Sequence, residues 1–226
     1  NVTATNVSID SDAGSLINAA SSTKNVTATN LRLQAQNGIG TSSRHLTTNI
    51  DNVTALASTG SIYVTEDNAA TVTNVTVSVT DVNSDATTTT VTDAAQSDLT
   101  TGLNGNIVLV ATRGDLTLND GSDADGITVT ANGTGNILLD SVAGSLTANA
   151  DILSGTGHIT LKAANNIALT ANVDVTTAST GTASLDAETG ALTMNGTANV
   201  TATISSARLR AQGDLTVGNV TATNVS

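Results

Sequence analysis

Aromatic side chains are almost absent from this 226-residue sequence, which contains Tyr63 but neither Phe nor Trp. Aromatic residues normally dominate the buried area of globular cores, so their near-absence fits a narrow solenoid better than a sandwich or an enzyme fold. Proline is absent too, which is compatible with long hydrogen-bonded ladders in which no donor is missing. The lack of cysteine excludes disulfides and thiolate metal sites.

Basic residues are also few, with 7 Lys and Arg against 19 Asp and Glu and a formal net charge of −12. Nucleic acids and anionic membrane surfaces bind basic patches, so we expect no nucleic-acid partner. The sequence has no run of 18 apolar residues, and we expect no membrane insertion. The chain begins at Asn1 without Met or a signal peptide, so we interpret it as a fragment or mature segment of a much longer protein.

Short strands of alternating apolar and polar residues recur from residue 105 to the end of the chain. They form five sets of three, separated by Gly, Asn, Asp or Ser at the corners, and the sets start at Gly105, Gly114 and Gly126; Gly135, Gly144 and Asp151; Gly157, Asn166 and Asn172; Gly181, Gly190 and Asn199; and Ser206, Gly213 and Asn219. Each set spans about 20–30 residues, the period expected of a solenoid.

This pattern predicts an all-β parallel β-helix, or β-solenoid, with three strands per rung and a right-handed coil. Alternation places Ile, Leu, Val and Ala inward and Thr, Ser, Asn and Asp outward. We predict one domain over residues 1–226 with about eight rungs, a rod of about 40 Å at the usual inter-strand spacing.

The first eight residues, Asn1 to Ser8, are repeated identically at the end of the chain, Asn219 to Ser226. The economical interpretation is a tandem array with a unit of 218 residues, the interval from Asn1 to Asn219. The alternative is that both ends carry a common rung motif, because a similar segment starts at Asn25. Related Asn-Val-Thr segments are predicted to stack on one face; they start at Asn1, Asn25, Asn52, Asn74, Asn199 and Asn219.

Residues from about 66 to 104 interrupt the rhythm and are too long for one plain rung. Strands are predicted at Val75 to Thr80 and at Thr87 to Thr92. We expect a protruding hairpin or enlarged corner, or one irregular double rung, and the excursion is the first candidate for a lateral contact.

A further motif runs from Leu31 to Glu66. It contains Leu31-Arg-Leu-Gln-Ala, Gly38-Ile-Gly-Thr, a polar excursion ending at Leu46, Val53-Thr-Ala and Gly60-Ser-Ile-Tyr-Val. This arrangement resembles the filamentous-haemagglutinin-like family of large bacterial exoproteins and adhesins. The resemblance implies a secreted or surface-tethered β-solenoid, exported through an outer-membrane secretion transporter.

Catalytic groups are scarce. His45 lies in the polar excursion and His158 follows Gly157, where the neighbouring sets have Asn106 and Asn136. Both are interpreted as surface residues, and glycan-cleaving β-helices use aromatic and basic residues that are nearly missing here. We expect no catalytic residues and no enzymatic activity.

The densest acidic segment is Asn119-Asp-Gly-Ser-Asp-Ala-Asp-Gly. Oxygen ligands at Asp120, Asp123 and Asp125 indicate a weak calcium candidate. A Gly stands where the first ligand of a helix-loop-helix calcium site should be, and no Glu closes the loop. The interpretation favoured by sequence is therefore a solvated turn and no cofactor, with calcium as the alternative.

Two surface features remain open. Glycosylation is possible at the sequons of Asn1, Asn25, Asn52, Asn74, Asn132 and Asn199, although Asn stacking also explains these residues. Thr pairs at Thr3, Thr27 and Thr201 allow an ice-binding face, interrupted by other rungs.

Together these observations predict a structural protein outside the cell or on its surface. The expected role is a rod or fibre segment that stacks on itself head to tail, with possible lateral bundling. The first alternative is a receptor- or glycan-binding adhesin module acting through residues 66–104, and a lesser one is ice binding.

Overall fold

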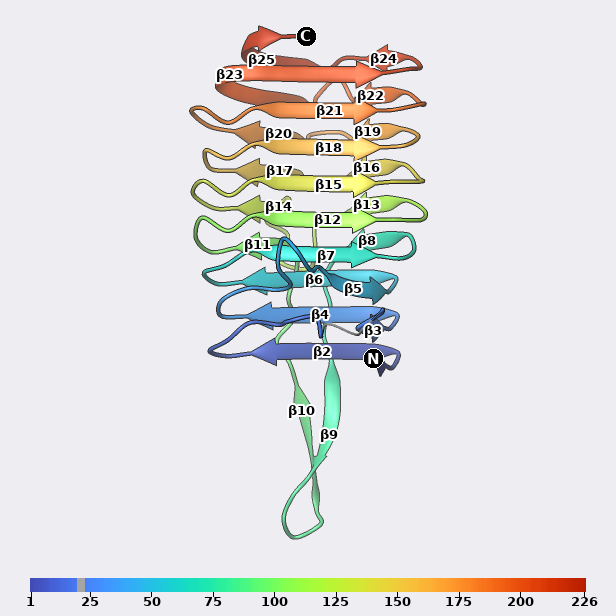
Figure 1. The fold of residues 1–226 in the computed structure, drawn as a ribbon, viewed down its shortest axis with the longest axis vertical. Helices are drawn as coiled ribbons and strands as arrows, with labels where there is room; N and C mark the ends of the chain where they lie inside the picture. The colour runs from blue at the N-terminus through green and yellow to red at the C-terminus, as the bar shows by residue number, and fades with distance from the viewer. Residues whose placement is uncertain (20–22) are drawn as a thin grey trace.

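A computed structural model describes residues 1–19 and 23–226, and these residues form strands and loops without a helix. The described part of the chain thus has no helix that could cross a membrane. Strands wind upward in stacked turns, with the N-terminus at one end of the stack and the C-terminus at the other (Figure 1). Nearly all of them belong to one 23-stranded sheet with parallel neighbours. The predicted all-β parallel β-helix is confirmed.

Three hydrogen-bonded ladders run along the stack. The first joins β2 (Asn6–Ser11), β4 (Asn30–Ala35), β6 (Asn52–Ala57), β11 (Leu99–Thr101), β14 (Ile127–Ala131), β17 (Asp151–Ser154), β20 (Asp174–Thr177), β23 (Asn199–Ala211) and β25 (Asn219–Val225). The second contains β1 (Val2–Thr3), β3 (Val26–Thr27), β5 (Leu46–Asn49), β7 (Ile62–Glu66), β12 (Ile107–Ala111), β15 (Ile137–Ser141), β18 (Ile159–Ala163), β21 (Ala183–Ala187) and the second half of β23. The third contains β8 (Ala70–Val72), β13 (Leu116–Leu118), β16 (Leu146–Ala148), β19 (Ile167–Leu169), β22 (Leu192–Met194) and β24 (Leu215–Thr216). Below β8 it continues into the start of β6, where Thr71 and Val72 pair with Asn52 and Val53.

The five sets of three strands expected after residue 105 are found in their predicted order. Four sets are β12–β13–β14, β15–β16–β17, β18–β19–β20 and β21–β22–β23, and the fifth is the second half of β23 followed by β24 and β25. β23 differs from the expectation because it continues from the first ladder into the second without a corner. Handedness and the number of rungs remain predictions.

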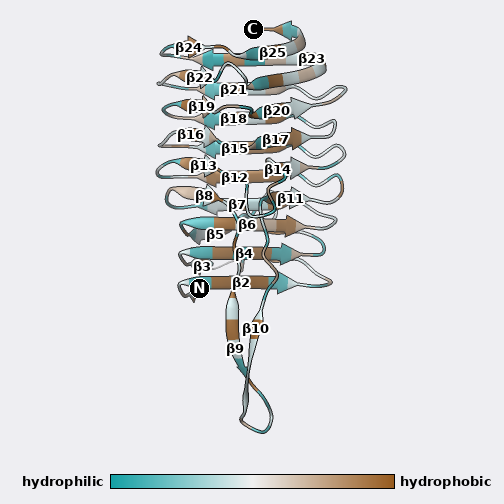
Figure 2. Ribbon diagram, turned by 180° about the vertical axis from the view of Figure 1, so that it is seen from behind, coloured by the Kyte–Doolittle hydropathy of each residue, from teal (hydrophilic) through white to brown (hydrophobic). Residues whose placement is uncertain are grey.

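The core consists of aligned small aliphatic side chains. The inward position of the first ladder is held by Leu33, Ala55, Leu99, Val129, Ile152, Val175 and Val200, none of them more than 1% exposed. Figure 2 shows apolar segments at successive levels of the stack. Each rung therefore covers the apolar face of the next, which a single rung could not do alone.

Glycine corners keep the rungs in contact. A Cβ on Gly105, Gly135 or Gly157 would lie 1.9–2.1 Å from the carbonyl oxygen of the glycine one rung below. Two of these carbonyls also accept hydrogen bonds from inward hydroxyls, from Thr101 Oγ1 to Gly105 O at 2.9 Å and from Ser154 Oγ to Gly135 O at 2.8 Å. A larger residue at these corners would separate the rungs.

The first 60 residues follow the predicted stack of Asn-Val-Thr segments only in part. Val26 pairs with Val2 and lies one rung above it. Leu16, which lies between them in the sequence, pairs with Ile39 in the same ladder, and an insertion follows Leu16. The predicted common stack of Asn-Val-Thr segments is consequently only partly right.

Two pairs of those segments do stack, Asn1 on Asn25 through the neighbouring valines and Asn199 on Asn219. Asn52 instead lies between Asn30 of β4 and Thr71 of β8, and Asn74 lies outside the strands. The predicted asparagine stacking is present at Asn52, whose Nδ2 donates to Asn30 Oδ1 at 2.8 Å.

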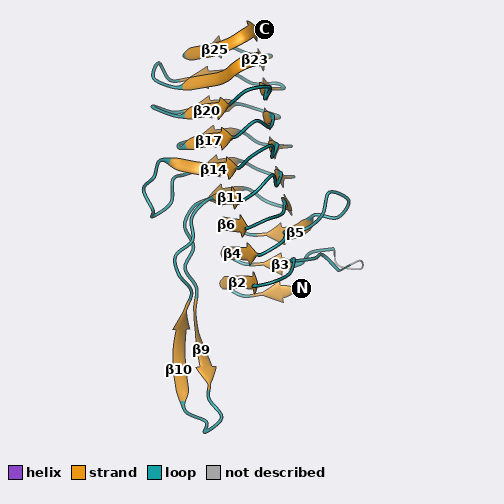
Figure 3. Ribbon diagram, turned by 90° about the vertical axis from the view of Figure 1, so that its left-hand side faces the viewer, coloured by secondary structure: helices purple, strands orange, loops and turns teal. Residues whose placement is uncertain are grey.

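The excursion is an antiparallel hairpin of β9 (Ser78–Val82) and β10 (Thr88–Thr92) on a two-chain stalk. It occupies residues 73–98, a narrower range than the predicted 66–104, because β8 and β11 already belong to regular rungs. The stalk runs along the rod, and β9 and β10 extend past β2 at the N-terminal end (Figures 1 and 3).

The stalk covers outward polar residues of the first ladder. Arg32 and Thr54 point away from the core, yet they are 6% and 0% exposed. Gln96 of the stalk donates from Nε2 to Leu33 O at 2.9 Å and to Thr54 Oγ1 at 3.2 Å. The stalk is therefore fixed to the rod, and the hairpin beyond it is exposed along its whole length.

Candidate functional site

An acidic cluster lies where the stalk rejoins the rod. Asp98 immediately precedes β11, and Asp123 and Asp125 lie in the loop 119–126 that precedes β14. Because β11 and β14 are paired neighbours, the two corners are adjacent. One carboxylate oxygen from each of the three residues lies within 4.8 Å of the other two. Figure 3 shows the stalk joining the rod at β11, next to the loop that leads into β14.

Asp98 is held rigidly in this cluster by its own backbone. Its carbonyl oxygen accepts hydrogen bonds from Ala55 N at 2.9 Å and from Thr54 Oγ1 at 2.8 Å. Its φ of +66° lies in the left-handed region that non-glycine residues rarely adopt. The residue is 6% exposed, and its Oδ1 atom is buried without a hydrogen-bond partner.

The loop 119–126 is closed by its own carboxylates. Asp125 Oδ1 accepts from Ile127 N at 2.8 Å, and Asp120 Oδ2 accepts from Gly126 N at 3.2 Å. The other oxygen of Asp120, Oδ1, is buried and lacks a partner. Ser122 N donates to Ser97 Oγ at 3.2 Å, which attaches the loop to the end of the stalk.

The electrostatics of the cluster are strongly repulsive. The pKa of Asp98 is raised to about 7, mainly by burial and also by the negative charges of Asp123, Asp125 and Asp120 and a hydrogen bond with Asp123. Burial and the charges of Asp174 and Asp125 also raise the pKa of Asp151, the next carboxylate up the same corner. The ion pairs formed by the described residues involve none of these carboxylates.

The structure brings together two of the three residues predicted from sequence, Asp123 and Asp125, and places Asp120 beside them. Asp98 was missed, because only the stacking of β11 under β14 brings it to the loop. Carboxylate oxygens alone suit hard divalent cations rather than zinc or copper. The cluster is thus the best candidate metal centre among the described residues.

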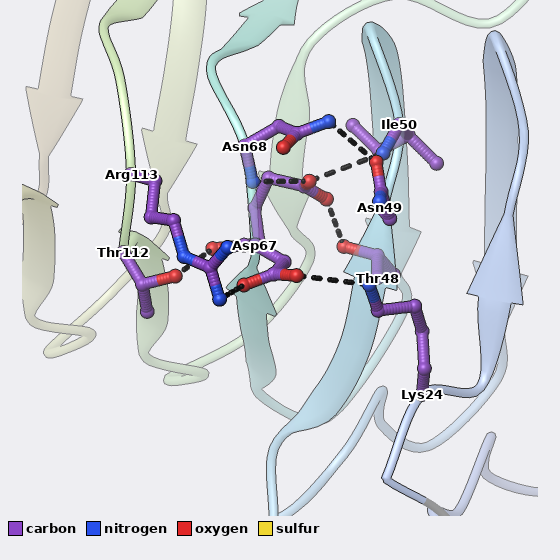
Figure 4. A network of polar contacts seen from close by, with 9 residues as sticks. Lys24, Thr48, Asn49, Ile50, Asp67, Asn68, Thr112 and Arg113 are labelled. Atoms are coloured by element: carbon purple, nitrogen blue, oxygen red, sulfur yellow. Dashed lines mark hydrogen bonds and ion pairs between the residues drawn. The ribbon is translucent and has the colours of Figure 1, made fainter.

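A second polar group surrounds Glu66, the last residue of β7 (Figure 4). Its side chain is fully buried, in an inward position that Ala111 and Ser141 occupy in the following rungs. Glu66 Oε1 accepts from Ile50 N at 3.1 Å and Asn68 N at 2.8 Å, and Oε2 accepts from Thr48 Oγ1. Burial raises the pKa of Glu66, and these hydrogen bonds oppose the rise.

Asp67 lies outside this corner and joins three rungs. Its carboxylate contacts Lys24 Nζ at 2.9 Å and Arg113 at 3.1 Å, and the hydrogen bond from Lys24 is the main cause of its lowered pKa (Figure 4). A hollow of about 190 Å³ beside it is lined mainly by threonines. All its charged groups are already paired, so the arrangement stabilises the stack.

The two histidines contact threonines of neighbouring rungs. His158 is exposed at a corner, and its backbone N–H donates to Asn136 Oδ1 at 2.8 Å. This bond confirms that His158 occupies the corner position that Asn136 holds one rung below. Its Nδ1 contacts Thr182 Oγ1 at 2.9 Å. His45 Nδ1 contacts Thr65 Oγ1 at 2.8 Å, and burial lowers its pKa.

Most of the predicted glycosylation sites use their side-chain amides within the protein. In four of them the side-chain Nδ2 donates a hydrogen bond: Asn25 to Asn18 Oδ1, Asn52 to Asn30 Oδ1, Asn132 to Thr101 O, and Asn199 to Asp174 Oδ1. Asn1 and Asn74 are exposed. These two are the sites at which a glycan would cost no hydrogen bond in the described ladders.

The threonine pairs do not make one flat face. Thr3 stacks on Thr27 in the second ladder, whereas Thr201 belongs to the first. In that ladder Leu153 interrupts the threonine row between Thr130 and Thr176.

Comparison of the chain with protein-family models, with curated proteins and with solved structures finds no match.

Proposed function

We propose that this chain is a structural rod segment of a secreted or cell-surface bacterial filament or adhesin stalk, which continues end to end through its open edges. The observation that carries the proposal is the character of the two ends. β1 and β2 pair only with the rung above them, and β24 and β25 only with the rung below. Unpaired strand edges are templates for further pairing.

Exposed apolar side chains gather at the same ends. Val2 and Ile17 are 47% and 69% exposed in the first rung, and Leu215, Val217 and Val225 are 44–57% exposed at the last. Between the ends, the core is aliphatic and continuous. A copy stacked on either end would extend the ladders and remove this apolar surface from water.

The repeated octapeptide supports stacking but occupies two different places. In the first copy Val2 lies in the second ladder, and in the last copy Val220 pairs with Val200 in the first. One sequence therefore fits two faces of the rod. In a covalent tandem array with the 218-residue unit, we expect the junction copies to adopt one of these placements throughout.

Electron microscopy of the concentrated protein tests the proposal. We expect end-to-end chains of uniform width, which Ala222→Pro shortens. Asn219 N donates to Ala198 O at 3.0 Å, so alternation points the N–H of residue 222 toward the free edge, where proline removes a donor without breaking the ladder below. Ala222→Val keeps the donor and is the matched control. Isolated rods at every concentration would contradict the proposal.

The second candidate function is recognition of a receptor or glycan by the hairpin. The hairpin carries exposed Val79, Val82 and Val91, which are 43–72% exposed. A groove of about 370 Å³ lies between its base and the first rung, and Val7 and Val77 line it. Binding that survives replacement of the hairpin by a short turn would exclude this role. Export through an outer-membrane transporter is part of the proposal for a secreted rod and precedes both functions.

A further inference from the structure

We propose that Asp98, Asp123 and Asp125, with Asp120 beside them, bind Ca²⁺ and thereby tie the stalk of the hairpin to the loop of the next rung. This inference does not depend on the rod function. It rests on the convergence of three carboxylates within 4.8 Å and on the burial of one of them, Asp98, whose Oδ1 has no hydrogen-bond partner.

Asp98 distinguishes this cluster from an ordinary acidic surface, because its carboxylate is buried and one oxygen has no hydrogen-bond partner. An isolated buried carboxylate oxygen is unfavourable unless it is paired, hydrogen-bonded or bound to a cation. Asp98 is 94% removed from solvent, since 6% of its surface is exposed, and two backbone-directed hydrogen bonds fix its position. These bonds anchor the backbone of Asp98 to β6 and Thr54, which keeps the residue beside the loop 119–126. A cation between Asp98 and the loop would give Oδ1 the partner it lacks.

The loop provides the remaining ligands on an already folded frame. Asp125 and Asp120 each use one oxygen to accept a backbone N–H, which orients the other oxygen of each carboxylate. The unpartnered Oδ1 of Asp120 is a second buried oxygen in need of a positive charge. Asp123 is exposed, so the site is open to solvent on that side for entry of the ion and for water ligands.

The donor set selects calcium among common cations. Every protein ligand is a carboxylate oxygen, which excludes the softer metals that prefer nitrogen or sulfur. Ca²⁺ accepts 6–8 oxygens in irregular geometry, and two exposed ligands with several waters suit it. Mg²⁺ demands a near-ideal octahedron and gives up its waters reluctantly. Because two ligands are exposed, we expect a dissociation constant of about 10⁻⁴–10⁻³ M, as in other open carboxylate sites.

Binding would change how firmly the stalk of the hairpin is held against the loop 119–126. Asp98 is the last residue of the hairpin excursion, and the loop 119–126 belongs to the rung above it. Without the ion, the mutual repulsion of four carboxylates opposes closure of the loop on the stalk. With the ion, the stalk and the loop are joined, and the direction of the hairpin is fixed.

The test compares the intact protein in chelator and in free CaCl₂ at matched ionic strength, by calorimetric titration and by Tm. We expect measurable binding heat, and a Tm higher by about 5–10 °C when free calcium is 100-fold above the dissociation constant. Asp123→Asn combined with Asp125→Asn should weaken binding at least about tenfold, because it removes two charged ligands. Asp81→Asn removes a charge from the exposed strand β9 and should leave binding unchanged.

Asp98→Asn keeps the shape of the buried side chain and provides the second variant. In chelator we expect its Tm to equal or exceed that of the wild type, and we expect calcium to shift it no further. The proposal is overturned if calcium neither binds nor shifts the wild-type Tm at about 10 mM, well above the expected dissociation constant. It is also overturned if the loop double variant and Asp81→Asn respond alike, or if Mg²⁺ produces as large a shift as Ca²⁺.

Discussion

At the scale of single residues, Glu66 shows how a charged side chain is accommodated in a core of small aliphatic residues. Three donors meet its carboxylate, two of them backbone N–H groups that have no other acceptor in this corner. Burial nevertheless outweighs these bonds and raises its pKa. The carboxylate therefore provides acceptors for these donors, but its buried charge lowers the stability of the fold at pH values where it is ionised.

We predict that Glu66→Gln is at least as stable as the wild type at pH 7. A glutamine Oε1 keeps both backbone donors, and its amide can donate to Thr48 Oγ1, so only the buried charge is lost. Glu66→Ala leaves the N–H groups of Ile50 and Asn68 unpartnered and should cost at least about 2 kcal/mol. Urea unfolding at pH 7 measures both variants. Equal loss in both would show that charge, and not hydrogen bonding, is what this corner requires.

The same pair of proteins gives a pH dependence with a defined sign. A raised pKa means that folded Glu66 binds its proton more tightly than the unfolded chain, so stability falls as pH rises above about 4.5 and through the raised value. Wild type should lose stability relative to Glu66→Gln over that window and show no further relative change above it. His45, whose pKa is lowered, titrates in both proteins and cancels from the difference. A difference that is flat from pH 4 to pH 8 would contradict the account.

Sequence could have revealed Glu66 but not Asp98. The alternation Ile62, Val64, Glu66 already places the carboxylate inward. Asp98 has no such pattern, because its neighbours belong to a stalk whose point of return is set by tertiary contacts. The acidic loop was visible in the sequence, whereas its buried partner required the stacking of the two corners.

At the scale of strands, the stacked ladder should concentrate stability in the inward positions. Leu161 is fully buried between Leu139 and Leu185 of adjacent rungs, whereas Thr160 beside it faces outward. We predict that Leu161→Ala costs about 2–5 kcal/mol, the usual cost of such a cavity. Thr160→Ala, the control, should change stability by less than about 0.5 kcal/mol. Thermal unfolding distinguishes them, and similar losses would argue that the interior is not tightly packed.

The hairpin, by contrast, should be dispensable for the rod. Asp93 N donates to Val77 O at 2.9 Å, so an Asn-Gly turn can replace residues 78–92 and close the stalk. We predict a circular dichroism spectrum typical of β structure and a Tm within about 3 °C of the wild type, because no core residue is removed. A collapsed or aggregated product would show that the hairpin protects the N-terminal edge.

The elements differ in how far sequence determines them. After Gly105 the strands follow one another in the same order, and alternation alone locates them; the missing corner within β23 is the exception. In the first rungs, insertions after Leu16 and Ile39 divide strands of the second ladder into two pieces. Leu16 and Val26 are therefore separated by an insertion in the sequence, and only the register of the ladder shows that they lie on the same side of the rod.

At the scale of the whole molecule, the sides of the rod differ from its two ends in polarity and in hydrogen bonding. Polar side chains and an excess of negative charge cover the side, while unpaired strand edges and exposed apolar residues mark the first and last rungs. Repeat architectures gain stability from each neighbouring interface, so an added rung at either end should be favourable. The central claim is that the ladder continues from one unit into the next.

Amide hydrogen exchange on a two-unit protein, residues 1–218 followed by residues 1–226, tests that claim most directly. In the single unit, residues 219–226 form an edge and should exchange faster than the covered strand β21. At the junction of the two-unit protein, the same eight residues should become as protected as β21, because rungs then lie on both sides. Junction residues that exchange as fast as they do in the single unit would contradict a continuous rod.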